Sequence, residues 1–128
     1  MSLLSPGGAA LVELMGETPR GPRREGVFAL WLTLRVAEDL LLAPPQADRA
    51  VKRRVAALQR RLSSLSLPAP LRRALVAALA ELNEPRREKA APVLQLLVAP
   101  AREALGSDAA EILGRAARSA AQRAAATS

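Results

Sequence analysis

Two pairs of carboxylates come nearest to a catalytic or metal-binding pattern in this chain. Glu38 and Asp39 are adjacent, while Glu84 and Glu88 lie four residues apart, as metal-binding carboxylates do on the helices of bundles. Sites of that kind pair Glu with His, and the chain contains no His. Arg35 is placed to neutralise Glu38 or Asp39, so we expect a structural ion pair there and no metal site.

The residue types that carry most enzyme chemistry are missing. The chain has no His, no Cys and no Tyr, which removes the commonest general base, the thiolate nucleophile and the phenolic acid. It also lacks a glycine-rich phosphate loop and any nucleophile motif. We therefore expect a protein that is not an enzyme and that binds no cofactor.

Positive charge is the most unevenly distributed property of the sequence. The formal net charge is +7, with 17 Arg and 2 Lys, and residues 46–73 alone carry a net charge of +7. A basic helical face can bind the phosphates of nucleic acid or of an anionic membrane, or it can be solvated and have no ligand. The candidate anion-binding face consists of Arg49, Lys52, Arg53, Arg54, Arg60, Arg61, Arg72 and Arg73.

Other features argue against sequence-specific binding of nucleic acid. The basic stretch holds no aromatic side chain on which a base could stack. A helix-turn-helix needs a turn of about three or four residues, whereas the break at residues 64–70 is longer and contains two prolines. Non-specific phosphate binding through the helix at 46–65 is therefore the alternative function. Binding to a membrane surface ranks below it, because aromatic residues are expected beside such a basic face.

Composition and periodicity predict an all-α fold. Ala and Leu are the commonest residues, whereas glycine and β-branched residues are few. We predict a compact bundle of five to six helices, with residues 1–128 forming one domain around a central apolar helix at about 26–43. Three charges make this helix unsuitable as a membrane span, and the first 25 residues do not resemble a signal peptide. We therefore expect a cytoplasmic protein.

The central helix has two different sides. On a helical wheel, Leu30, Leu34, Ala37 and Leu41 share the side that we expect to face the core. The opposite side, which we call the aromatic stripe, carries the chain's only Phe, its only Trp and the three charges of the helix. The aromatic stripe consists of Phe28, Trp31, Arg35, Glu38, Asp39 and Leu42.

The aromatic stripe is the predicted partner interface. Aromatic residues and Arg are enriched at protein interfaces, and a small domain cannot easily bury both sides of one helix. We expect a second copy of the chain across a two-fold axis, or a different protein, to cover this stripe. The alternative is that the chain's own C-terminal helices cover it.

The remaining helices are predicted from periodicity and from capping residues. Residues 1–25 hold a short helix, which Ser5 caps, and a loop at 16–26 that is rich in Gly, Pro and Arg. Pro92 and Pro100 either kink a helix at 85–105 or each open a short one. Two helix pairs offset by about 40 residues leave an α-solenoid fragment as a weaker alternative. Further helices are predicted at 46–65, 70–83 and about 108–124, before a frayed tail at 125–128.

Overall fold

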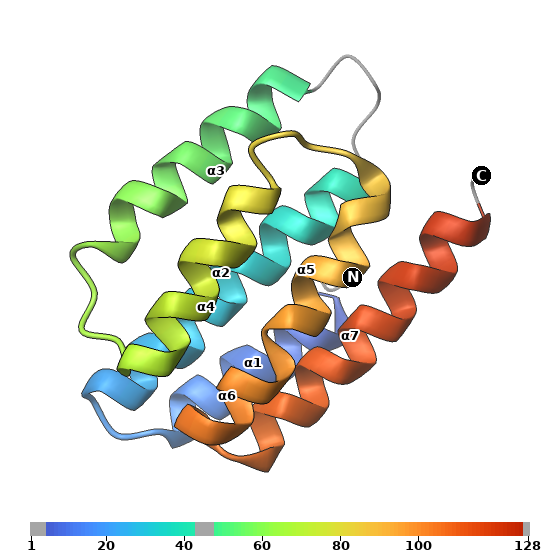
Figure 1. Cartoon of the computed structure of the whole chain (residues 1–128). Helices are drawn as coiled ribbons and strands as arrows, with labels where there is room; N and C mark the ends of the chain where they lie inside the picture. Colours follow the sequence, from blue (N-terminus) through green and yellow to red (C-terminus); the bar gives the residue numbers. More distant parts are fainter. Residues whose placement is uncertain (1–4, 43–47, 127–128) are drawn as a thin grey trace.

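The computed structural model describes residues 5–42 and 48–126 (Figure 1). Within these ranges the chain is all-α, and α5 and α6 are separate helices with only Leu97 between them. The predicted compact, all-α bundle is therefore confirmed. The elements are α1 (Pro6–Glu17), α2 (Pro22–Leu42), α3 (Asp48–Leu62), α4 (Ala69–Glu81), the 3-10 helix η2 (Arg87–Lys89), α5 (Ala90–Leu96), α6 (Val98–Leu105) and α7 (Ser107–Ala126).

The predicted central helix is α2. It packs against α1, α3, α5, α6 and α7, and ten of its 21 residues are buried. Leu30, Leu34, Ala37 and Leu41 are among them, as the wheel predicts. A helix that contacts neighbours on most of its sides needs apolar residues around most of its circumference, which explains the unusual hydrophobicity of this stretch.

The start of α2 corrects the sequence prediction. The helix begins at Pro22 and not at about 26, so the predicted loop at 16–26 is shorter. Gly26 misled the prediction because glycine usually weakens a helix. Here it allows a close approach, since a Cβ atom at this position would lie 3.0 Å from side-chain atoms of both Leu71 and Leu105. Residue 43, the predicted end of this helix, lies outside the described residues.

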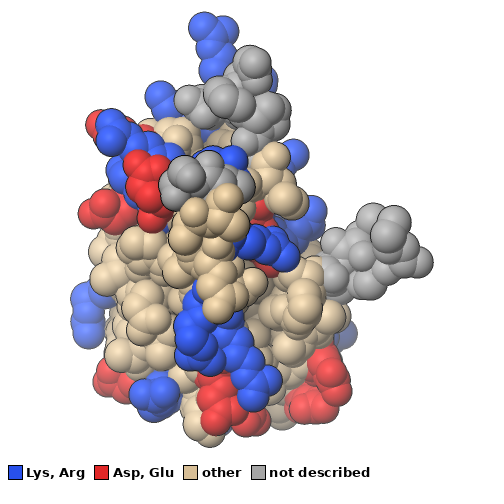
Figure 2. All heavy atoms as spheres, turned by 90° about the vertical axis from the view of Figure 1, so that its right-hand side faces the viewer, with Lys and Arg blue, Asp and Glu red and all other residues tan. Residues whose placement is uncertain are grey.

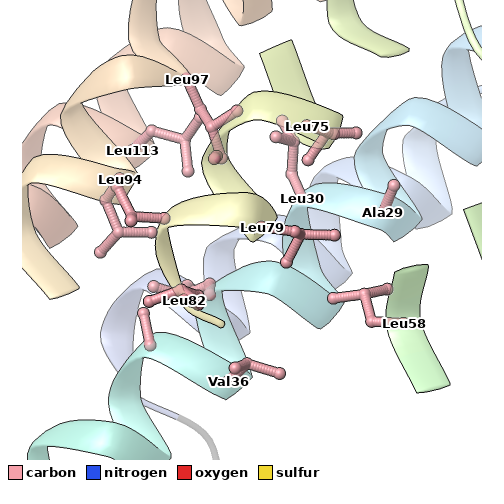
Figure 3. Close-up of a cluster of buried hydrophobic side chains, with 14 of the residues drawn as sticks. Ala29, Leu30, Val36, Leu58, Leu75, Leu79, Leu82, Leu94, Leu97 and Leu113 are labelled. Atoms are coloured by element: carbon pink, nitrogen blue, oxygen red, sulfur yellow. The ribbon is translucent and has the colours of Figure 1, made fainter. Parts of the chain in front are cut away.

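The largest buried side chains meet between α2, α4 and the C-terminal helices. Figure 3 shows Leu30 of α2 beside Leu75 and Leu79 of α4, while Leu94 and Leu113 approach from α5 and α7. All five are at most 1% exposed. Burying a side chain of this size contributes about 1.5–3 kcal/mol, so these leucines supply much of the energy that holds the helices together.

The last helix, α7, packs along several earlier helices. Its buried face is mostly alanine, and it contacts α1, α2, α5 and α6. At Gly7 of α1, an added Cβ would lie 3.2 Å from Leu34 and 3.5 Å from Ala116. The first and last helices therefore meet, which excludes an α-solenoid, whose ends stay apart. In the predicted frayed tail at 125–128, Ala125 and Ala126 are helical and residues 127–128 lie outside the described ranges, so the fraying stays a prediction.

The basic helix is α3, and it packs mainly against α2 and α4. The spacing of Val51, Val55, Leu58, Leu62 and Leu65 predicts an apolar seam along this helix. The first four are at most 5% exposed, which confirms the seam within α3, whereas Leu65 lies beyond the end of the helix and is only partly buried. The seam turns the positive charges of α3 away from the core. In Figure 1, α3 lies at one edge of the bundle and α7 at the opposite edge.

The two prolines between 85 and 105 lie within the first turns of short helices. Pro92 is the third residue of α5, and Pro100 is the third residue of α6. The first four N–H groups of a helix have no partner within the helix, so proline costs little there. Of the two predicted alternatives, separate short helices are confirmed. Across the described residues, no helix combines the length and the hydrophobicity that a membrane span requires.

Candidate partner-binding groove between α2 and α3

The aromatic stripe of α2 lies next to α3. The rings of Phe28 and Trp31 stack with their centroids 6.1 Å apart and an angle of 28° between their planes. The Arg35 guanidinium lies 5.1 Å from the Trp31 ring centroid, and the Arg61 guanidinium of α3 lies 5.2 Å from that of Phe28. Both aromatic residues are half-buried. The two cations therefore cover part of the aromatic surface that we predicted as an interface.

Within the chain, the acidic residues of the stripe do not pair with Arg35, so the ion pair predicted within α2 is wrong. Asp39 pairs with Arg54 of α3, across the space between the two helices. Glu38 accepts a hydrogen bond of 2.8 Å from the hydroxyl of Ser5, which also caps α1 by accepting from the backbone N–H of Gly8. Arg35 instead stacks on Trp31, because its flat guanidinium matches the face of the indole ring.

Beside the stripe, α2 and α3 enclose a groove of about 620 Å³. Its lining has two parts, an apolar floor and a charged rim. The floor is formed by Leu32 and Val36 of α2 and by Ala57 and Leu58 of α3, and the rim is formed by Arg35, Asp39, Arg54, Arg60 and Arg61. We call this feature the α2–α3 groove.

The rim of the α2–α3 groove carries four positive charges and one negative charge. Arg54 is neutralised by Asp39. Arg35 and Arg61 stack on aromatic rings, which leaves the N–H edges of their guanidinium groups available. Within the described part of the chain, the Arg60 guanidinium makes no hydrogen bond or ion pair. Three cations at this rim therefore have no carboxylate partner among the described residues.

The predicted anion-binding face separates into several groups in the structure. Arg49, Lys52 and Arg53 are exposed on the outer side of α3 and are not among the residues that line the groove. Arg73 is exposed on α4. Arg72 is partly buried and donates to the carbonyl oxygens of Leu62, at 2.8 Å, and Leu65 at the end of α3. It therefore stabilises a helix C-terminus and is not part of an exposed face.

Leu42, the last residue of the aromatic stripe, is 75% exposed at the end of α2. It does not line the groove. Leu32 and Ala57 do line the groove, although neither is among the site residues predicted from the sequence. Leu32 lies at the margin of the stripe on the wheel, but the contribution of Ala57 depends on how α3 docks, and no periodicity within one helix shows that.

A smaller cavity of about 270 Å³ lies where the start of α1 meets α2, α5 and α7. Ser5, Glu38 and Arg115 supply polar groups, while Leu41 and Ile112 belong to its apolar lining. Figure 2 faces the α7 side of the molecule, where basic and acidic side chains are interspersed over a largely uncharged surface. The charge on this side is therefore mixed, unlike that of the groove rim.

No group of three or more Asp, Glu, His or Cys side chains comes together as a metal site within residues 5–42 and 48–126. Glu84 lies near Arg86, at 3.8 Å, and near Lys89, at 4.0 Å, which are weak surface ion pairs. Comparison with protein-family models, with curated proteins and with solved structures finds no match for this chain.

Proposed function

We propose that this chain is a non-enzymatic interaction protein that binds a partner protein through the α2–α3 groove. The observation that carries the proposal is the combination of an apolar floor with a rim of Arg residues beside two stacked aromatic rings. Interface centres are enriched in aromatic residues and Arg, with polar groups around an apolar middle. A partner could therefore bury the floor and pair with the rim, without any cofactor.

The charge of the groove favours a different protein over a second copy of the chain. Two copies that met through this groove would bring Arg35, Arg60 and Arg61 of one copy near the same cations of the other. Juxtaposed like charges oppose association. The homodimer predicted from the sequence stays a prediction, which light scattering at high protein concentration tests directly.

Trp31→Ala separates the interface role of the stripe from a purely structural role. If the stripe joins two copies, the variant dissociates into a smaller species that is still helical. If its role is only structural, the variant keeps the mass of the wild type and unfolds more easily. Oligomer mass and the free energy of unfolding must therefore both be measured.

Non-specific binding of nucleic acid is the second candidate, and the outer side of α3 supports it. Arg49, Lys52 and Arg53 are exposed there, and such a row can contact successive phosphates. Elution from DNA resin in a salt series tests this candidate. Retention that falls steeply with salt and is weakened by Arg49→Gln with Arg53→Gln supports it over the groove. A cytoplasmic location also stays a prediction.

Site-specific photo-crosslinking tests the proposed function. Ala57 in the groove is replaced by a photo-crosslinking amino acid in cells that express the chain, and Ala77, which is exposed on α4, is the matched control position. We expect a protein, identified by mass spectrometry, that crosslinks from position 57 alone and is lost on Arg35→Glu with Arg60→Glu. Crosslinking to nucleic acid, to a second copy only, or equally from position 77 contradicts the proposal.

A further inference from the structure

We infer that the occupant of the α2–α3 groove is a short amphipathic helix whose apolar side is flanked by Asp and Glu. This inference rests on the proposed function and names the class of partner. It is drawn from the length of the groove, from the side chains on its floor and from the charges on its rim.

The length of the groove fits about two turns of helix. Its lining runs from Leu32 to Asp39 on α2 and from Arg54 to Arg61 on α3, which are matching stretches of eight residues. At 1.5 Å per residue, each stretch is roughly 10 Å long. An incoming helix would therefore place apolar residues spaced i, i+3 or i+4, and i+7 along the floor, which is the pattern of helix-in-groove recognition.

Both walls of the groove are helices, which favours a helical occupant over an extended one. An extended peptide gains affinity by adding a strand to the edge of a sheet. The described residues contain no strand, and the backbone polar groups of α2 and α3 are engaged within these helices. A bound segment must therefore satisfy its own backbone hydrogen bonds, and a helix does so internally.

Ala57 leaves room for an incoming side chain. It lines the groove and is exposed, while the next residue, Leu58, is buried in the seam that attaches α3. A larger residue at position 57 would occupy this space. Leu32 and Val36 form the α2 half of the floor, so the floor offers aliphatic surface that a phosphate backbone cannot use but a leucine side chain can bury.

The rim selects for carboxylates. Arg35 and Arg61 are held over the rings of Trp31 and Phe28, which orders their guanidinium groups before a partner binds. A carboxylate can accept two parallel hydrogen bonds from the N–H edge of a guanidinium. Arg60 adds a third cation without a carboxylate partner among the residues described. Glu or Asp on either side of an apolar stripe would meet all three.

The experiment uses the full chain and a synthetic peptide of roughly 14 residues, about four helical turns. The peptide places Leu at i, i+4 and i+7, flanks them with Glu and contains no Trp. The chain has one Trp, at position 31, so its fluorescence reports events beside the groove. Three control peptides keep the length but scramble the Leu spacing, replace Glu with Lys, or carry a central Pro that breaks the helix.

We expect the acidic peptide to bind and all three control peptides to bind at least about tenfold more weakly, a difference of roughly 1.4 kcal/mol. Ala57→Leu and Arg60→Glu should each weaken binding of the acidic peptide by a similar factor. The matched controls Ala77→Leu on α4 and Lys52→Glu, which the helical wheel places on a different side of α3 from Ala57, should leave it within about twofold. Far-UV circular dichroism and thermal unfolding confirm that each variant is folded, and Ala57→Gln replaces Ala57→Leu if the latter does not fold.

Several outcomes overturn the inference. Equal binding of the scrambled or Pro-containing peptide shows that the groove does not recognise a helix, and equal binding of the Lys peptide shows that the rim does not select for carboxylates. If the acidic peptide does not bind while position 57 still crosslinks to an identified protein, the inference fails and the proposed function stands. If neither occurs, both fail.

Discussion

The helices α3 and α7 lie at opposite edges of the same bundle and pack against it through side chains of different size. The buried residues of α3 are Val and Leu, and its other sides carry Arg and Lys. Those of α7 are Ala109, Ala110, Ala117 and Ala120, with Leu113 the one large side chain among them. Small side chains allow helix axes to approach closely, and α7 contacts four other α-helices.

The difference between α3 and α7 shows how the size of the side chains on a helix can leave a groove beside it. The bulky seam of α3 fastens it to α2 and α4. Two of its long Arg side chains, Arg54 and Arg61, reach Asp39 and Phe28 of α2 beside the groove. The cavity that α7 borders, where it meets α1, α2 and α5, is smaller, at about 270 Å³. The side of the molecule that stabilises the fold and the side that we propose for binding are therefore separate.

The largest expected effect on the free energy of unfolding comes from replacing a buried leucine by alanine, either in α7 or in α3. Leu113→Ala should lower the free energy of unfolding by about 2–5 kcal/mol, because Leu113 is 0% exposed and a cavity there cannot collapse easily. Leu58→Ala should cost less, roughly 1–3 kcal/mol, because its cavity would open towards the groove. Denaturant unfolding measures both values.

Leu96→Ala on α5 is the matched control. Leu96 is 53% exposed, so its truncation should change the free energy of unfolding by no more than about 0.5 kcal/mol. An equal loss for Leu113→Ala and Leu58→Ala would mean that α3 is as firmly packed as α7, which contradicts the proposed difference between the two sides.

Gly106, between α6 and α7, should be the position whose substitution has the next largest effect on stability. Gly106 follows α6 with φ 100° and ψ 178°, a backbone conformation that only glycine adopts readily. Gly106→Ala should therefore cost about 1–3 kcal/mol. Gly16→Ala in α1 is the control, because nothing lies within 4 Å of an added Cβ there and alanine favours the helix by up to about 1 kcal/mol. Thermal unfolding should separate the two variants in opposite directions.

Much of the fold could be predicted from the sequence because single helices carry their own periodicity. The seam of α3 and the buried side of α2 follow from spacing alone. The start of α2 at Pro22 could not be predicted, because the reason for Gly26 is its contact with Leu71 and Leu105, which are distant in the chain. Tertiary proximity is visible in the structure but not in the periodicity of one helix.

The candidate site was predictable in part for the same reason. The grouping of Phe28 and Trp31 with Arg35 follows from the wheel, since all three belong to one helix. The pairing of Asp39 with Arg54 and the contact of Arg61 with Phe28 join two helices. In the sequence, Arg35 is the cation nearest to Asp39. In the structure, the packing of α3 against α2 pairs Asp39 with Arg54 instead.

The ion pair across the groove should contribute little to stability. Side chains of Arg54 and Asp39 are 59% and 36% exposed, and exposed pairs contribute roughly 0.2–1 kcal/mol. A double-mutant cycle with Arg54→Gln and Asp39→Asn measures this coupling, which should shrink in 1 M salt because the Debye length falls to about 3 Å. A coupling of about 3 kcal/mol that resists salt would show that the pair fastens α3 to the bundle.

The smallest expected effect concerns the positive charges of α3. Arg49, Arg53 and Arg60 are all exposed, so changing the three to Gln should cost under about 0.5 kcal/mol each and leave the melting temperature within a few degrees. Removing like charges from a chain with a net charge of +7 also relieves repulsion in the folded state. A collapse of the fold would show that the seam of α3 was misread. An unchanged melting temperature means that the fold does not need these cations, so any loss of binding in the same variant reports on the surface itself.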